Sequence, residues 1–337
     1  MWLRRLVLLS CGLLVLVTAI VDVISSKDRD FELSGPYTHK NLSIFLVHGD
    51  ERTDPEILIT LAEALKMDKI AVHEKGDVQE LEVECKSDAP VFIQSGCMVK
   101  GGRQDRVLRY DMVVAPKSGR QPIKAFCIEQ GRWSQRGDEN VKEFKAVPGI
   151  VGSKKIKAAA TISESQADVW MEVDSLQKQF QNYIRSGRAS DVDYLTSLPL
   201  AMEDREVKAK INEYMETLNP YIINQNDAIG VVVAINGEIS CGDFYRSSVL
   251  FSKMRNALIE ATAVEAAAAF RDSLNTKSLD KSEVLKWLES AEEGEPNVVK
   301  INDSMTLKII ETDKSVTFES FYGTTHQEWI HKNVLSR

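Results

Sequence analysis

Residues 101–106 read Gly-Gly-Arg-Gln-Asp-Arg, and residues 127–133 read Cys-Ile-Glu-Gln-Gly-Arg-Trp. Each run follows or closes an apolar stretch of strand character, which predicts two strand-end or loop elements on one β scaffold. Together the runs supply three guanidinium groups, two carboxylates, two amides and an indole. Such a density of directional polar groups indicates either a ligand site or a buried ion-pair network, and the residues alone leave both interpretations open.

The two runs have the composition of an anion site. Adjacent glycines permit positive φ and leave backbone N–H groups unobstructed, and successive exposed amides form an anion-binding concavity. Arginines add planar donors that match phosphate or carboxylate, glutamine amides can read hydroxyl groups, and an indole can stack on a ring. The ligand-binding residues predicted on this basis are Gly101, Gly102, Arg103, Gln104, Arg106, Gln130, Arg132 and Trp133.

Glu129 and Asp105 are the candidate catalytic carboxylates. Strand alternation puts Cys127 and Glu129 on one face of their strand. If Glu129 faces inward, burial raises its pKa unless an arginine compensates the charge, and an uncompensated carboxylate can act as a general base. The alternative is a tight hairpin whose arginines pair with Asp105, Asp111 or Glu129, so that both motifs merely lock the sheet.

Composition limits the other classes of function. The 337 residues are 43% hydrophobic and 27% charged, ordinary values for a globular protein. The net charge of −8, with scattered basic residues, argues against nucleic acid as a partner. Walker, Gly-x-Ser-x-Gly, Gly-x-Gly-x-x-Gly and Cys-x-x-Cys patterns are absent, and His326 and His331 lack the His-Glu-x-x-His spacing of a zinc site. We therefore predict no metal and no cofactor.

The N-terminus resembles a targeting segment. Basic residues at positions 4 and 5 precede an almost unbroken apolar stretch over residues 6–21. Residues 1–25 are therefore predicted to be a signal peptide or a membrane anchor, followed by a polar tether over 26–40. The protein is expected to be exported to a periplasmic or extracellular location, or anchored in the membrane by this segment. Export permits disulfides, and the state of the four cysteines that follow is left open: Cys85, Cys97, Cys127 and Cys241.

Periodicity predicts an α+β fold with a mixed or antiparallel sheet, a β-rich N-terminal half and a helix-rich C-terminal half. The interpretation is a single extended domain over 41–337, with a subdivision into 41–135 and 160–337. A long loop is predicted over 134–163, where a functional or mobile segment is expected. The Asn236-Gly237 pair predicts a hairpin turn. The expected strands are 41–47, 81–85, 91–99, 106–115, 123–129, 228–235 and several within 298–322, and the expected helices start at 54 and cover 169–184, 207–218, 246–275 and 280–292.

The two motifs resemble the ADP-ribosylglycohydrolase- and rhodanese-phosphatase-superfamily-associated protein domain family. That family is characterised by Gly-Gly-(Lys/Arg)-Gln-(Asn/Asp)-Arg and by Cys-(Val/Ile)-Glu-x-Gly-Arg-Trp. The run Gln-Ala-Asp-Val-Trp at 166–170 and the strand over 230–237 are similar to it as well. The resemblance covers most of the chain after residue 40 and implies binding or processing of ADP-ribose-like ligands. The export segment and the lysine-bearing loop over 134–155 depart from the family pattern.

Three hypotheses of function follow. The first is a binding module for an anionic small molecule that bears phosphate or ribose, such as an ADP-ribose-like ligand. The second is a hydrolase that acts on such a ligand through Glu129 and Asp105. The third is a structural or partner-binding envelope protein without a small-molecule site. In all three, no nucleic acid is expected, and the membrane is a partner only if the N-terminal segment stays uncleaved.

Overall fold

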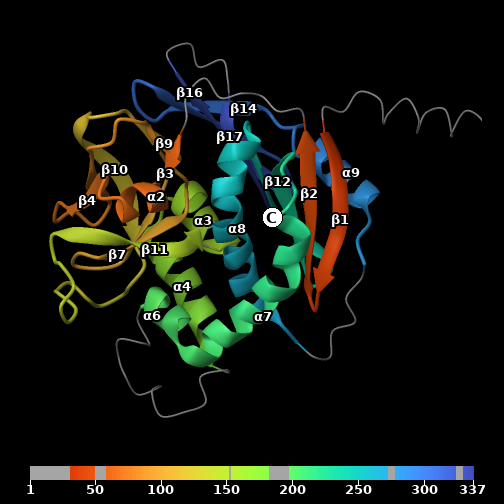
Figure 1. The fold of residues 1–337 in the computed structure, drawn as a ribbon, viewed down its shortest axis with the longest axis horizontal. Helices are drawn as coiled ribbons and strands as arrows, with labels where there is room; N and C mark the ends of the chain where they lie inside the picture. Colours follow the sequence, from red (N-terminus) through yellow and green to blue (C-terminus); the bar gives the residue numbers. More distant parts are fainter. Residues whose placement is uncertain (1–30, 50–57, 152, 182–196, 272–277, 324–328) are drawn as a thin grey trace, which may run out of the picture.

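A large antiparallel sheet, a closed β-barrel beside it and helices that cover the sheet make up the fold (Figure 1). The structure is a computed structural model. This architecture confirms the predicted α+β class, while the predicted signal or anchor segment lies outside the described residues. The structure describes residues 31–49, 58–151, 153–181, 197–271, 278–323 and 329–337.

Strands from both ends of the described chain form the large sheet. Their order is β1–β2–β12–β13–β17–β16–β15–β14, and every neighbouring pair is antiparallel. The barrel is thus inserted in the sequence between two adjacent strands, β2 and β12. The strands are β1 (Phe31–His39), β2 (Leu42–Gly49), β12 (Ala228–Ile235), β13 (Glu238–Tyr245), β14 (Pro296–Lys300), β15 (Met305–Glu311), β16 (Ser315–Tyr322) and β17 (Trp329–Ser336).

Seven α-helices and one π-helical turn are present in the described part of the chain. Side-chain caps fix several helix starts, as for α8, where the Ser247 hydroxyl accepts the N–H of Leu250. The helices are α2 (Leu61–Lys66), α3 (Lys154–Ala158), α4 (Gln166–Gln181), α6 (Leu198–Glu203), α7 (Arg205–Ile222), α8 (Ser248–Ala269) and α9 (Lys281–Ser290), and the π-helical turn is η1 (Ala159–Ser163).

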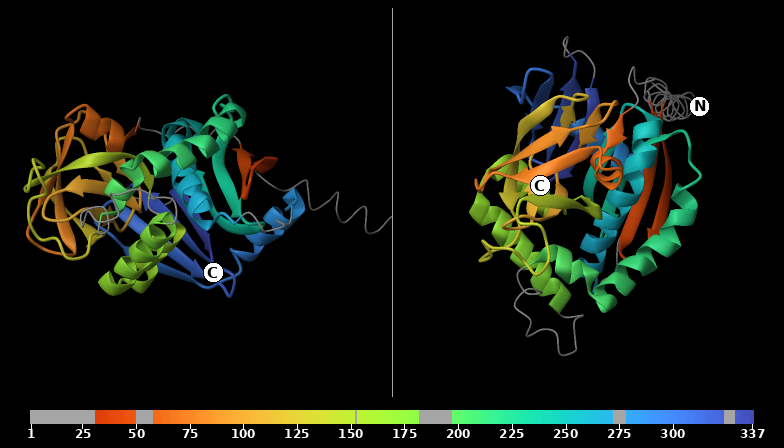
Figure 2. Two further views of the ribbon diagram at one scale, coloured as in Figure 1. Left: turned by 90° about the horizontal axis from the view of Figure 1, so that it is seen from below. Right: turned by 60° about the vertical axis from the view of Figure 1, so that its left-hand side comes forward.

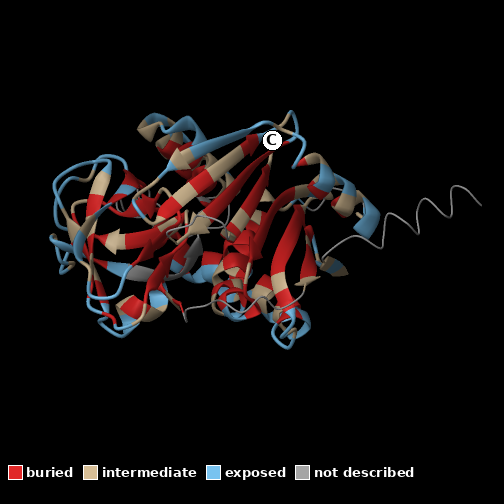
Figure 3. Cartoon of the chain, turned by 90° about the horizontal axis from the view of Figure 1, so that it is seen from above, coloured by how far each residue is buried: buried red, intermediate tan, exposed pale blue. Residues whose placement is uncertain are grey.

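Helices cover both faces of the large sheet, which explains the unbroken apolar run in β2. Alternate residues Leu42, Ile44 and Leu46 pack into the main core with α4, α7 and α8. The intervening Phe45 and Val47 pack on the opposite face in a smaller core that includes residues of α9. The stretch of a strand that is buried on both faces is nearly continuous in apolar residues, so it loses the alternation of a half-exposed strand. Figure 3 shows this burial along the strands of the sheet.

The barrel lies at one end of the molecule (Figure 2). Its strand order is β10–β5–β4–β11–β7–β8, and closure leaves no free edge. A separate apolar core fills it, with Leu81, Val83 and Val99 among its fully buried members. The barrel strands are β4 (Ile70–Glu74), β5 (Glu80–Cys85), β7 (Cys97–Gly101), β8 (Arg106–Leu108), β10 (Gly119–Cys127) and β11 (Glu143–Val151), and a three-stranded sheet beside them contains β3 (Ile59–Thr60), β6 (Val91–Ile93) and β9 (Met112–Val114).

Four sequence expectations need correction. The predicted loop over 134–163 contains β11, α3 and η1; β11 owes its conformation to pairing with β4 and β7 rather than to its own pattern. The C-terminal half is less helix-rich than predicted, because it also supplies strands β12 to β17. Residues 31–39 of the predicted tether form β1. The helix expected from residue 54 begins in the described chain at Leu61, while residues 50–57 lie outside the described part.

Other expectations are confirmed. The predicted strand 228–235 is β12, and Asn236 and Gly237 both have positive φ, as a two-residue hairpin of this type requires. The cysteines of the described residues are all free thiols: Cys85, Cys97, Cys127 and Cys241. No helix among the described segments is long and apolar enough to cross a membrane.

Candidate functional site

The barrel brings the two sequence motifs together. The first motif spans the end of β7 and the start of β8, and the second begins at the end of β10. Cys127 pairs with Arg106, and Arg106 pairs in turn with Val99, so the three strands are neighbours. The prediction of strand-end elements on one β scaffold is therefore confirmed.

The Asp105 carboxylate is fully buried and surrounded by donors. Arg136 reaches both of its oxygens at 3.1 Å, as a bidentate pair. Ser197 Oγ donates to Oδ2 at 2.8 Å, and the N–H of Gly101 donates to Oδ1 at 3.0 Å. Arg132 approaches the same carboxylate at 3.4 Å. All of these donors belong to the chain itself, so the carboxylate is already satisfied.

Glu129 shares the same two guanidinium groups. Arg132 Nε donates to Oε2 at 2.7 Å, and Arg136 donates to Oε1 at 3.2 Å. Burial raises the pKa of Glu129 and the neighbouring charge of Asp105 raises it further, while Arg132 and Arg136 oppose the rise. Both carboxylate oxygens are engaged, so Glu129 orients its partners in this structure rather than standing free as a base.

Arg106 lies in a neighbouring pocket of the same network. Its side chain is 0% exposed, and its guanidinium meets Glu74 at 3.3 Å and Gln104 Oε1 at 3.3 Å, with Cys127 Sγ in contact. Trp133 covers it, with the guanidinium carbon 5.5 Å from the ring centre. Arg103 sits on the same ring at 5.3 Å. Trp133 is 41% exposed, so its indole caps a buried cation while part of the residue stays in contact with solvent.

The double glycine does not form an open anion concavity. Gly101 and Gly102 have the positive φ expected for them, +127° and +54°. Their N–H groups, however, donate to Asp105 and to the carbonyl of Asn140. A Cβ on Gly102 would lie 2.3 Å from the ring of Phe144. These glycines allow close packing of the barrel end, and their amides are already used.

Sequence reasoning missed several members of this network. Arg136, Glu74, Ser197 and Glu139 complete it, and they come from three different parts of the chain. The signal available in the sequence was Arg136, which follows the second motif directly. Of the predicted residues, only Gln130 is both exposed and outside the contacts described above.

The third motif, at 166–170, fastens α4 to the barrel. The amide of Gln166 pairs with both backbone groups of Cys127, accepting its N–H at 2.9 Å and donating to its carbonyl at 2.7 Å. Val169, three residues later on α4, packs in the main core. The glutamine thus acts as a substitute strand neighbour for β10.

A second set of charged residues is buried between the barrel and the sheet, and the sequence motifs did not predict that they meet. We call Asp111, Lys157, Asp243 and His331 the buried cluster. His331 Nδ1 lies 2.7 Å from Asp111 and its Nε2 lies 3.1 Å from Asp243. Lys157 Nζ lies 3.3 Å from Asp243. His331, which lacks zinc-site spacing to His326, lies on strand β17, and His326 lies outside the described residues.

Electrostatics hold the buried cluster in its charged form. Burial alone would lower the pKa of His331, but attraction and hydrogen bonds from Asp111 and Asp243 raise it to about 9. Burial likewise opposes ionisation of both aspartates, yet their partners keep the pKa of each below its usual value. The pKa of Lys157 is raised by Asp243 against the effect of burial. Two positive and two negative charges therefore balance at neutral pH.

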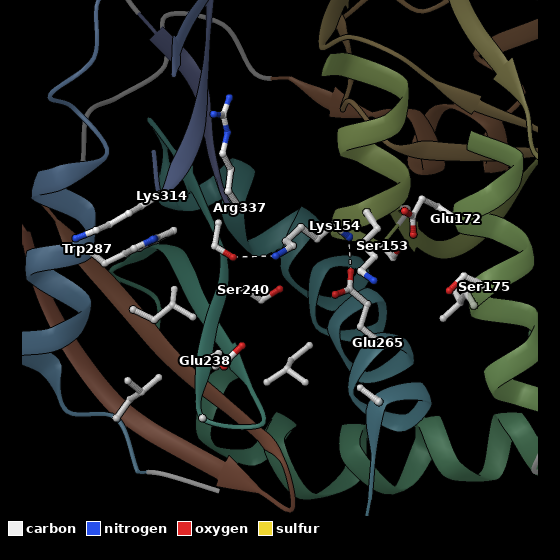
Figure 4. A pocket seen from close by; sticks show the side chains of 18 of the residues that line it. Ser153, Lys154, Glu172, Ser175, Glu238, Ser240, Glu265, Trp287, Lys314 and Arg337 are labelled. Atoms are coloured by element: carbon white, nitrogen blue, oxygen red, sulfur yellow. Dashed lines mark hydrogen bonds between the residues drawn. The ribbon is translucent and has the colours of Figure 1, made fainter. Parts of the chain in front are cut away.

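A cavity of about 600 Å³ opens on the side of the large sheet (Figure 4). Its walls are α4, the C-terminal half of α8, α9, the start of α3, the β12–β13 turn and the ends of β16 and β17. Basic side chains that line it are Lys154, Lys155, Lys314 and Arg337, and acidic ones are Glu172, Glu238, Glu265 and Glu283.

Lys154 and Glu265 lie at the centre of this cavity. The backbone N–H of Lys154 donates to the Glu265 carboxylate, and Lys154 Nζ donates to Ser336 Oγ at 2.8 Å. Burial raises the pKa of Glu265, against the hydrogen bond and charge of Lys154. A titratable group with a perturbed pKa in a cleft marks a candidate functional site.

The cavity also has an aromatic wall and free cations. Trp287 of α9 forms one side, with Lys314 beside it (Figure 4). Within the described residues, neither Lys155 nor Lys314 has a carboxylate at ion-pair distance. Among those residues no group of three or more His, Cys, Asp and Glu side chains is arranged to hold a metal ion.

The comparison with protein families supports the resemblance seen in the motifs. The model of the ARG and Rhodanese-Phosphatase-superfamily-associated Protein domain, ARPP-1, matches residues 30–335. The chain belongs to this family. The ARPP-1 match includes the barrel network, the buried cluster and nearly all of the cavity wall. Neither curated proteins nor solved structures gave a match.

Proposed function

We propose that this ARPP-1 protein is a binding module for an anionic small molecule that bears phosphate and ribose, and that the ligand binds in the cavity around Lys154 and Glu265. The observation that carries the proposal is a cavity of about 600 Å³ in which the backbone N–H of Lys154 donates to the half-buried Glu265 carboxylate. This volume lies within the range of roughly 300–1,000 Å³ typical of small-molecule sites.

The charges of the cavity favour a ligand with both anionic and hydroxyl groups. Lys154, Lys155 and Lys314 offer ammonium donors to a phosphate. The glutamates would repel a plain anion but accept hydrogen bonds from sugar hydroxyls, as acidic residues do in nucleotide sites. Trp287 offers a ring face for a base. An ADP-ribose-like molecule has all three features, which supports the ligand class implied by the motif resemblance.

The motifs themselves support a structural role better than a catalytic or ligand-binding one. The carboxylates of Asp105 and Glu129 are bound by Arg132 and Arg136, and the Arg106 guanidinium is bound by Glu74. A hydrolase that used these carboxylates would first have to break the network. The hydrolase hypothesis therefore rests on Glu265 instead, whose raised pKa suits an acid or base.

A thermal-shift screen tests the proposal. The full chain is melted with ADP-ribose, ribose 5-phosphate and inorganic phosphate, each also with the variants Lys154→Met and Lys210→Met. A ligand at a hundred times its Kd stabilises the native state by about 2.7 kcal/mol, which shifts Tm by a few degrees. We expect a shift with ADP-ribose that Lys154→Met abolishes and Lys210→Met keeps, since Lys210 is exposed on α7, away from the cavity.

The outcomes separate the hypotheses. No shift with any of the three probes would contradict the binding module and favour the structural or partner-binding role. A shift that survives Lys154→Met but is lost in Arg103→Ala would move the ligand to the motifs. Release of ribose or phosphate during incubation, lost in Glu265→Gln, would identify a hydrolase.

The N-terminal segment supports the additional proposal that the module is exported or membrane-anchored. Fractionation of expressing cells tests it, with and without residues 1–25. Equal recovery of both forms in the cytoplasm would contradict export.

A further inference from the structure

Three chain segments run from the buried cluster to the cavity. α3 has two lysines in the cavity wall and one in the cluster. β13 has an aspartate in the cluster and a serine in the cavity wall, and β17 has a histidine and a serine placed in the same way. The pairs, with the cluster residue first, are Lys157 and Lys154 on α3, Asp243 and Ser240 on β13, and His331 and Ser336 on β17.

Polar contacts in the cluster fasten these segments to one another. Asn333 of β17 donates to the carbonyl of Gly242 of β13 at 2.9 Å. Lys157 Nζ reaches Asp243 at 3.3 Å and Asn333 Oδ1 at 3.5 Å, so it ties α3 to both strands. The aliphatic part of Lys157 is packed so tightly that a Cβ on Gly96 would lie 2.6 Å from it. The position of α3, and with it the position of Lys154, depends on this contact.

When His331 is protonated, its ring donates to both Asp111 and Asp243. The charged groups that face the ring are Asp111 from the segment before β9, Asp243 from β13 and Lys157 from α3. The neutral groups are the Tyr245 phenol, whose ring stacks on the imidazole at 4.7 Å, and the Ser320 hydroxyl, which shares Asp111 at 2.7 Å. The Cys97 thiol of β7, whose pKa is raised to about 11 by burial, also stays neutral. A neutral imidazole has a single N–H and can donate to only one of the two aspartates.

We propose that Lys157, Asp243 and His331 are positioning residues for the ligand cavity, holding α3, β13 and β17 in the binding arrangement while His331 is protonated. This inference rests on the proposed function for its binding readout, but not for its structural readout. Loss of the proton removes the histidine N–H from one of the two aspartates, and with it the side-chain bond that ties His331 of β17 to Asp111 or to Asp243. The other donors of that aspartate and the backbone ladder between β13 and β17 remain. The cavity wall loosens as a result, and ligand affinity falls at alkaline pH.

Two measurements on the full chain test the proposal, with Lys157→Met and His331→Gln as variants. Amide hydrogen exchange at Lys154, whose N–H donates to Glu265, needs no ligand. We expect at least tenfold faster exchange in both variants at pH 7, with amides of β12 as the reference for global unfolding. ADP-ribose binding should weaken at least tenfold in both variants. In the wild type it should decline as the pH rises through about 9, the pKa of His331.

His73→Gln is the matched control, because His73 also pairs with a carboxylate, Glu84 at 3.0 Å, but lies in the barrel away from the cavity. Exchange at Lys154 that stays at the wild-type rate in Lys157→Met and His331→Gln would overturn the proposal. If His331→Gln does not fold, the exchange rate at Lys154 in Lys157→Met and Asn333→Ala tests the proposal instead. If the wild type binds no ADP-ribose, the proposed ligand is wrong, and the exchange result still decides whether the cluster positions the cavity wall.

Discussion

Replacing Arg106 by alanine distinguishes a ligand site from an internal lock at the two motifs. The guanidinium is fully buried, lies 3.3 Å from Glu74 and is capped by Trp133. In the variant the Glu74 carboxylate, which is only 4% exposed, still accepts the hydrogen bond from the backbone N–H of Arg103 but loses its cationic partner. A lock predicts loss of stability, whereas a ligand site predicts loss of binding in an intact fold.

The expected loss is large. Removing one partner of a buried ion pair costs about 3–5 kcal/mol, because the other charge stays buried without compensation. Against a total stability of roughly 5–15 kcal/mol, that change lowers Tm by on the order of 5–10 °C. Urea unfolding followed by circular dichroism measures it, and thermal melting gives a second estimate.

Arg103→Ala is the matched control for this measurement. Arg103 lies over the same indole, is partly exposed and forms no ion pair within the described residues. The hydrogen bond from the backbone N–H of Arg103 to Glu74 is still present in this variant. We expect a loss below about 1 kcal/mol, as for an exposed cation–π contact. An Arg106→Ala protein as stable as Arg103→Ala, but unable to bind ADP-ribose, would refute the structural interpretation of the motifs.

Three further predictions follow from single sites. The pKa of His331 is raised to about 9 from 6.5, so its contribution to the free energy of unfolding is fully present below about pH 6.5 and lost as the pH rises through about 9. Urea unfolding should show that this free energy falls by about 3 kcal/mol across that window. An equal fall in His331→Gln would disprove the assignment to His331. Gly102→Ala should lower the free energy of unfolding by about 1–3 kcal/mol more than Gly137→Ala. Both glycines have a similar positive φ, but only a Cβ on Gly102 would clash with Phe144. Equal denaturation midpoints of the two variants would count against that clash. Burial raises the pKa of Cys97 and Cys127 to about 11. Mass spectrometry should therefore find both thiols unmodified after the native protein is treated with iodoacetamide at pH 8. Rapid labelling would show instead that the two thiols are accessible.

The sequence was sufficient to predict the fold class and the hairpin at Asn236-Gly237, because strand periodicity and turn chemistry are local properties. It also predicted that the two motifs meet, since both lie at strand ends. It failed at β11, whose conformation is set by pairing with β4 and β7. No local pattern in residues 143–151 reports that pairing.

The site was harder to predict than the fold. Arg132 pairs with the motif carboxylates Asp105 and Glu129, as the alternative interpretation expected. The partner of Arg106, however, is Glu74, which no motif connects to it. The buried cluster joins His331 to residues far away in the chain, so no spacing rule could reveal it. Lys154 was visible only as part of a lysine-bearing loop, and its partner Glu265 lies within an alanine-rich helix that looks entirely structural.

A crystal structure of the full chain soaked with ADP-ribose tests the central claim most directly. The account predicts ligand density in the cavity between α4, α8 and α9, with the phosphates at Lys154 and the base against Trp287. Density at Arg103 and Trp133 on the barrel, with the cavity empty, would contradict it.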